Sequence, residues 1–173
     1  DIKGKKILVW SEQGLGDCIQ FCRYVPELSK LGADITFVTP PPLSTLLKSL
    51  SEDIRVTDTC DDLGGFDFQV PLMSIPLIFN TEIATIPSST SYLRSDPIKQ
   101  KIWEDRVRSE KSLRVGLVWN GGFRPDQPEM WAVNERRNVP LSIVARLQHL
   151  NNIQFYSLQK GDPAESELEA NKT

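Results

Sequence analysis

Short apolar runs alternate along this chain with longer segments in which apolar residues recur at helical spacing. Four apolar runs, at residues 6–10, 34–38, 54–56 and 66–70, are typical of buried strands. Between the first two runs an apolar residue returns every three or four positions, at Leu15, Ile19, Cys22 and Val25. Strands and helices that alternate in this way predict a parallel α/β sheet.

The residues that break regular structure help to place the element boundaries. Pro26 falls inside the first helical pattern and should kink or end that helix, and Gly32 is a natural helix stop. Further along, Asp96 followed by Pro97 predicts another helix start, because an acidic cap and a first-turn proline both favour a helix N-terminus. That helix carries an apolar face made of Ile98, Ile102, Trp103 and Val107.

The strand–loop–helix pattern then begins a second time. Residues 113–119 and 153–158 predict two more strands, and a helix opened by proline is expected over residues 140–150. Both units end their first strand on a Val-Trp pair, at Trp10 and at Trp119, just before a glycine turn. The two units therefore have the same local design.

The fold class predicted from this pattern is α/β. Residues 1–110 should form a Rossmann-like parallel sheet, and residues 111–173 the start of a second, incomplete Rossmann-like unit. Two strands and one helix cannot make a full domain core, and residues 162–173 have little to bury. We therefore expect a fragment, which either pairs with another copy of itself or loses order beyond Gly161.

Composition limits the classes of protein to which the chain can belong. Its 173 residues are 39% hydrophobic and 25% charged, as in globular proteins. A net charge of −3 without a basic stripe argues against nucleic acid as a partner. No apolar run approaches the ~18–20 residues of a membrane-spanning helix. Because residues 1–6 also lack the apolar core of a signal peptide, we expect a cytoplasmic protein.

The three cysteines, Cys18, Cys22 and Cys60, form no C-x-x-C motif. An odd number with this spacing argues against a disulfide framework and against a zinc site. Cys18 and Cys22 stand one helical turn apart and are expected to be small core residues. We expect no bound metal.

The loop after the first strand carries the residues that point to chemistry. Gly14 and Gly16 permit a tight turn and a close approach of the backbone to a ligand. A helix that begins here directs free backbone N–H groups at the loop, which favours an anion. Asp17 adds a negative charge instead, which suggests proton transfer or a hydroxyl partner. The alternative is a carboxylate that caps the helix or simply stands in its first turn.

Two common phosphate-binding motifs do not fit this loop. A dinucleotide fingerprint would need a glycine at position 19, where the chain has Ile19. A Walker P-loop would need a Gly-Lys-Ser/Thr sequence, which the loop lacks. An unrelated Rossmann-like nucleotide- or NAD-dependent enzyme stays an alternative hypothesis, which the broken glycine pattern disfavours.

Three segments together make a more specific pattern than any one of them. They are WSEQGLGD at 10–17 with RYVP at 23–26, VGLVWNG at 115–121, and RNVPL at 137–141 with SLQKG at 157–161. With these segments the chain resembles bacterial glycosyltransferases of the GT-B type. The resemblance is greatest to the glycosyltransferase-like domain that follows tetratricopeptide repeats in many bacterial proteins, and more distant to the lipopolysaccharide heptosyltransferases.

This resemblance implies two Rossmann-like domains with the active site between them. The nucleotide-sugar donor would bind mostly to the C-terminal domain, and the acceptor mostly to the N-terminal domain. In the heptosyltransferases an aspartate in a Gly-Asp pair of the first loop is the proposed general base, and Asp17 matches it. A carboxylate at this position can accept the proton of the acceptor hydroxyl as the sugar–phosphate bond breaks.

The same resemblance nominates residues on both sides of the reaction. Candidate acceptor-binding residues are Glu12, Gln13, Gly14, Gly16 and Gln20. The departing diphosphate needs cations or backbone N–H donors. The candidates for this role are Asn120, Gly121, Gly122, Arg136, Arg137 and Lys160. No cofactor is expected, with the nucleotide-sugar counted as a substrate.

The chain departs from the heptosyltransferase pattern at two points. Gln20 stands where these enzymes often carry a histidine, and the donor motif Asp-Thr followed by His-Leu-Ala-Gly is absent. We therefore expect no turnover from this fragment alone. The predicted function is transfer of a sugar from a nucleotide-sugar to an acceptor hydroxyl. The alternative is a non-catalytic binding module, built on a degenerate glycosyltransferase fold beside tetratricopeptide repeats.

Overall fold

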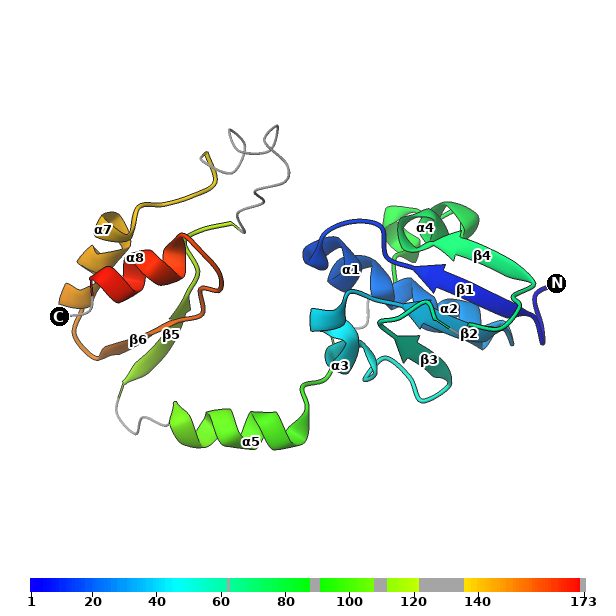
Figure 1. Cartoon of the computed structure of the whole chain (residues 1–173), viewed down its shortest axis with the longest axis horizontal. Coiled ribbons are helices and arrows are strands. Elements are labelled where there is room, and N and C mark those ends of the chain that lie inside the picture. The colour runs from blue at the N-terminus through cyan, green and yellow to red at the C-terminus, as the bar shows by residue number, and fades with distance from the viewer. Residues whose placement is uncertain (62, 88–90, 108–111, 122–135, 172–173) are drawn as a thin grey trace. The chain divides into compact units, whose positions relative to one another are not determined.

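The chain is divided into two compact units in a computed structural model that describes residues 1–61, 63–87, 91–107, 112–121 and 136–171 (Figure 1). Unit 1 spans Asp1–Ile102, and unit 2 spans Trp103–Thr173. The boundary expected between residues 110 and 111 lies outside the described residues. No helix of the described residues is long and apolar enough to cross a membrane.

Unit 1 is built on a four-stranded parallel sheet in the order β3-β2-β1-β4. Its strands are β1 (Lys6–Trp10), β2 (Asp34–Val38), β3 (Ile54–Thr57) and β4 (Phe68–Pro71). The parallel pairing of these four strands confirms the sheet predicted from the apolar runs. A parallel sheet of this kind, with helical crossovers, is compatible with a Rossmann-like fold.

Short helices connect β1 to β2 and β2 to β3, and further short helical segments follow β4. They are α1 (Leu15–Phe21), α2 (Val25–Lys30), α3 (Ser44–Leu47) and α4 (Ile75–Ile78), with 3₁₀ turns at Cys22–Tyr24, Pro41–Leu43, Leu72–Ser74 and Ile83–Thr85. Pro26 lies in the first turn of α2, directly after the 3₁₀ turn, so the predicted break at this proline is confirmed. Gly32 follows α2 with a φ of 86°, which a residue with a side chain rarely adopts.

The core of unit 1 lies on one face of its sheet. Ile7, Val9, Ile35 and Phe37 point to this face and are buried. Side chains from the helices and turns pack against them, including Cys22, Val25, Leu28, Leu47 and Ile75. The apolar residues that β1 and β2 bury in this core are the odd-numbered ones, which fixes the register of the sheet.

The three cysteines differ in their accessibility to solvent, and two of them are core residues, as predicted. Cys18 and Cys22 are buried, whereas Cys60 is exposed. Burial raises the pKa of the Cys22 thiol to about 12, and burial also raises the pKa of Cys18. Because the thiolate is the reactive form, neither buried thiol should react near neutral pH.

This difference predicts the result of thiol labelling. In native protein at pH 7.5, a disulfide reagent such as Ellman's should modify one thiol quickly, and Cys60→Ser should abolish that fast phase. Unfolding in guanidinium should expose all three. Fast reaction of two or more thiols in the native protein would contradict the buried placement of Cys18 and Cys22.

The next helix, α5 (Pro97–Arg106), begins as predicted but does not bury its apolar face. The Asp96 carboxylate oxygen Oδ1 accepts hydrogen bonds from the backbone N–H groups of Ile98 and Lys99, at 2.8 and 3.1 Å. No residue of the helix is buried, and Trp103 is 57% exposed. The apolar spacing thus identified the helix, while its apolar residues are exposed to solvent.

Unit 2 contains a separate parallel sheet of two strands, as predicted. The strands are β5 (Leu113–Leu117) and β6 (Ile153–Ser157). The helix expected over residues 140–150 is instead a short helix followed by a 3₁₀ turn, α7 (Leu141–Val144) and Ala145–His149.

The prediction that residues 162–173 have little to bury was wrong. The structure has a helix here, α8 (Ala164–Ala170), which packs against the rest of unit 2. Ala164 is fully buried, and Leu168, one helical turn further, packs with Trp119 and Leu141. Two apolar residues four positions apart were therefore enough to dock a short helix.

Candidate active site

The candidate residues of unit 1 follow the carboxyl end of its central strand, β1. The backbone N–H of Ser11 donates to the Val38 carbonyl at 3.2 Å, which extends the β1–β2 ladder by one residue. The chain then turns into α1, with Gly14 as the helix N-cap. Ligands of open parallel sheets bind beyond the carboxyl ends of the strands, so the position fits a binding loop.

Asp17 is the third residue of α1 and is partly buried. Gly14, not Asp17, occupies the N-cap, and no side-chain hydrogen bond caps the helix. The structure thus excludes the N-cap role for Asp17 and confirms that it stands in the first turn of α1. Its carboxylate oxygens have no hydrogen-bond or ion-pair partner in the described chain.

The candidate acceptor-binding residues surround Asp17 in sequence and differ in exposure. Glu12 and Gln13 are exposed in the loop, and Gln20 is exposed one helical turn after Asp17, on the same side of α1. A Cβ atom at Gly16 would meet no other atom within 4 Å. The space beside this backbone is therefore open.

Arg23 fixes the far end of α1, a role that sequence reasoning missed. Its guanidinium donates to the Gln20 carbonyl at 2.9 Å and to the Tyr92 hydroxyl at 3.0 Å, and it lies 4.5 Å from the centre of the Tyr92 ring. The Tyr92 hydroxyl in turn donates to the Ile19 carbonyl at 3.0 Å. The two Tyr92 hydrogen bonds join residues more than 60 positions apart, and no local sequence pattern indicates them.

In unit 2, the buried side chain of Gln159 holds the turn that follows β5. Its Oε1 accepts the backbone N–H groups of Trp119 and Asn120, at 3.1 and 3.0 Å. Its Nε2 donates back to the Asn120 carbonyl at 3.1 Å. One amide side chain after β6 therefore satisfies three backbone groups after β5.

Asn138 makes a second contact with the same turn. Its Oδ1 accepts the backbone N–H of Gly121 at 2.9 Å, and the Val139 N–H donates to the Trp119 carbonyl at 2.9 Å. Arg137 directly precedes Asn138, so its backbone lies close to the turn. Gly122 lies outside the described residues.

The three candidate cations of unit 2 have different surroundings. Arg136 and Arg137 are exposed, and within the described chain Arg137 has no hydrogen bond or ion pair. Lys160 is 92% exposed and pairs with Glu165 at 3.3 Å. Arg137 is thus the cation with the clearest capacity to take an outside anion.

Sequence reasoning missed Gln159 and Asn138 as individual residues. Both stand in the segments RNVPL and SLQKG, which follow predicted loop and strand elements. The sequence gives one signal for such a role, which is an amide side chain close to the end of a predicted strand or loop. Such amides are recognised only when the backbone group opposite them is known.

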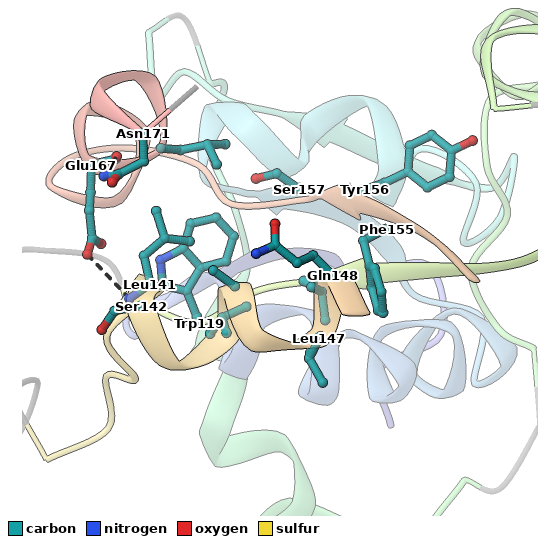
Figure 2. A pocket seen from close by; sticks show the side chains of 14 residues that line it. Trp119, Leu141, Ser142, Leu147, Gln148, Phe155, Tyr156, Ser157, Glu167 and Asn171 are labelled. Carbon is teal, nitrogen blue, oxygen red and sulfur yellow. Dashed lines mark hydrogen bonds between the residues drawn. The ribbon is translucent and has the colours of Figure 1, made fainter. Parts of the chain in front are cut away.

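Unit 2 also contains a cavity of about 380 Å³ on the helix-covered face of its sheet. Figure 2 shows α7 and the following turn on one side of it, and Glu167 and Asn171 on the other. The Glu167 carboxylate accepts the backbone N–H of Leu141 at 3.3 Å, the dashed line in Figure 2. The indole N–H of Trp119 is buried without a hydrogen-bond partner in the described chain.

No group of three or more His, Cys, Asp or Glu side chains in the described residues is arranged to hold a metal ion. The candidate side chains described above carry carboxylate, amide, guanidinium and ammonium groups. These can orient hydroxyls and bind anions.

Comparison with known proteins gives one distant relative. The chain is 21% identical over 181 residues to protein FlbA of Caulobacter vibrioides, an alignment that covers 94% of this chain and 29% of FlbA. The chain thus spans less than a third of this relative. No protein-family model matches the chain, and no solved structure matches it.

Proposed function

We propose that this chain is a glycosyltransferase-like domain that acts in transfer of a sugar from a nucleotide-sugar to an acceptor hydroxyl. The observation that carries the proposal is the Asp17 carboxylate in the first turn of α1, beyond the carboxyl end of β1, which has no hydrogen bond or ion pair within the described chain. The chain has two α/β units, each built on a parallel sheet and each with a loop after its first strand. Such units are compatible with the two Rossmann-like domains of the GT-B fold.

Asp17 would act as the general base on the acceptor. An acceptor hydroxyl that donates to this carboxylate becomes a better nucleophile, because its proton is withdrawn while the sugar–phosphate bond breaks. The exposed side chains of Glu12, Gln13 and Gln20 would bind neighbouring hydroxyls of the acceptor. Open space beside Gly16 lets a ligand approach the backbone.

Unit 2 would bind the diphosphate of the donor. The turn Asn120–Gly121 is braced from both sides by Gln159 and Asn138. Arg137 directly precedes Asn138 and Lys160 directly follows Gln159, and both would supply positive charge to the leaving group. Release of Lys160 from Glu165 costs little, because the pair is largely exposed.

A second candidate is a non-catalytic binding module on the same fold. The observation that favours it is the exposure of apolar side chains around α4, where Leu77 is 79% and Ile83 is 92% exposed. Exposed apolar side chains that gather into one surface patch are typical of protein-binding sites, and these residues lie close together in sequence. The two candidates differ in whether replacing Asp17 should impair function, because a binding module needs no general base.

The donor side is tested by replacing Arg137 with alanine in the full-length gene product. Because a charge-assisted contact to phosphate is worth about 1.5–3 kcal/mol, nucleotide-sugar binding should weaken roughly tenfold or more. The loss should shrink as salt rises, since screening already weakens the contact. Calorimetric titration of each variant with the nucleotide-sugar measures both effects.

A matched control is Arg146→Ala, which removes an equal charge from the 3₁₀ turn after α7. It should leave nucleotide binding unchanged. Equal affinities for wild type and Arg137→Ala would show that the donor does not bind at this turn.

A further inference from the structure

The two faces of the unit 1 sheet are covered differently. The core face packs against α1–α4, as described above. The connection from β3 to β4 must cross β2 and β1, because the strand order is β3-β2-β1-β4. It crosses the opposite face, where its residues Gly64, Gly65 and Phe66 lie against residues of β1, β2 and β3. This connection contains no helix among its described residues.

A polar cavity of about 190 Å³ lies between this connection and the sheet. The strand residues that line this cavity are Lys6, Asp34, Thr36 and Arg55. The parallel register explains their proximity, because Lys6 is the partner of Asp34, and Thr36 is the partner of Arg55. Lys6 and Asp34 are the first residues of their strands, so the cavity lies toward the amino ends of the strands, away from the loop with Asp17.

The charges that face this cavity are not paired with one another. Within the described chain, neither the Lys6 ammonium nor the Arg55 guanidinium forms a hydrogen bond or an ion pair, and Asp34 has no ion pair. Asp67, which lies next to Lys6, accepts the Lys6 backbone N–H at 2.8 Å and is paired with Lys5 at 3.4 Å. The cavity walls thus carry one positive charge in excess.

Thr36 places a hydroxyl group in the wall of this cavity. It is 6% exposed and lines the cavity, yet its hydroxyl has no hydrogen-bond partner among the residues that the structure describes. The Thr36 oxygen is not sealed off from solvent, so a molecule that enters the cavity can reach it. Gly64 and Gly65 have no atom within 4 Å of where a Cβ would stand, so a ligand can reach their backbone.

We propose that this cavity binds a compact oxyanion, a phosphate or a carboxylate group, held by Lys6, Arg55 and the Thr36 hydroxyl. Arg55 and Lys6 would supply charge-assisted hydrogen bonds, and Thr36 would donate its O–H. The cavity leaves room for a small group between the connection and the sheet. This site is separate from the proposed transfer site and does not depend on it.

The test is a titration of the full chain with inorganic phosphate, and separately with acetate, at constant ionic strength. Amide NMR shifts of Gly64 and Gly65 report on occupancy. We expect saturable shifts with at least one of the two anions, and the tighter of the two identifies the group. Arg55→Gln and Lys6→Gln should each weaken binding about tenfold, and Asp34→Asn should strengthen it by removing the repulsive charge.

Two further variants separate a site from general charge attraction. Lys48→Gln removes the same charge outside the cavity and should leave binding unchanged. Thr36→Val keeps the shape of the side chain and removes its hydroxyl, so it should weaken anion binding while the unliganded protein stays as stable or becomes more stable.

Absence of saturable shifts with both anions would overturn the proposal. Equal losses for Lys48→Gln and Arg55→Gln would also overturn it, because they would indicate general screening. A destabilising Thr36→Val with unchanged anion binding would show that the hydroxyl serves the fold instead.

Discussion

Replacing Asp17 with asparagine should lower sugar transfer by about 100-fold or more in the full-length gene product, the usual scale for loss of a general base. The asparagine side chain has nearly the same shape, but it cannot accept a proton. The fold should be unaffected, because the Asp17 carboxylate forms no hydrogen bond or ion pair with the described chain. Initial rates with a nucleotide-sugar donor and its acceptor measure the loss, and circular dichroism checks the fold.

The pattern of kinetic constants distinguishes a base from a residue that only orients the acceptor. A general base acts in the transition state, so Asp17→Asn should lower kcat more than it raises the KM of the acceptor. Asp53→Asn, which removes an exposed carboxylate before β3, is a matched control and should retain full activity. Activity of Asp17→Asn within about twofold of wild type would remove this residue from the mechanism and favour the binding module.

Much of unit 1 was predictable from the sequence, because its strands are buried on one face and end at strong breakers. The run Lys6–Trp10 is apolar at its core-facing positions, and Gly14 permits the turn that places Asp17 after the strand. A parallel strand flanked by helices has few alternative arrangements under the right-handed crossover rule. The position of Asp17 at the carboxyl end of β1 followed from these local features alone.

The predictions that failed concern packing between segments. The apolar stripe with Ile98 and Trp103 correctly indicated a helix, yet no residue of α5 is buried, because periodicity shows amphipathicity and not which partner covers it. Conversely, α8 has only Ala164 and Leu168 to pack, and it docks because Trp119 and Leu141 present a matching apolar surface. That surface is assembled from residues 23 or more positions away.

The same limit applies to the candidate site. A turn at Asn120–Gly121 could be predicted from its residue types, but not its braces, since Gln159 lies 39 residues from Asn120. A glutamine after a strand carries no local signature of the backbone groups it will satisfy. Side chains that hold a site in place are therefore harder to predict than those that touch the ligand.

The largest effect on unit 2 is expected from Gln159→Leu. Leucine fills a similar volume but leaves the backbone N–H groups of Trp119 and Asn120 and the carbonyl of Asn120 without their partner. An unsatisfied buried donor costs about 1–3 kcal/mol, so the local free energy of unfolding should fall by roughly 2–4 kcal/mol. Native-state hydrogen exchange of the β5 amides measures this loss within unit 2.

Two controls assign the loss to the brace. Gln154→Leu makes the same change at an exposed position of β6 and should alter exchange by less than about 0.5 kcal/mol. Gln159→Glu retains an acceptor for both N–H groups and loses the donor to the carbonyls of Asn120 and Lys160, so it should cost less than Gln159→Leu. If the turn presents the donor diphosphate, nucleotide binding should weaken in the same order, with Gln159→Leu the weakest. Stability losses that are equal for Gln154→Leu and Gln159→Leu would show that the turn holds its shape without Gln159.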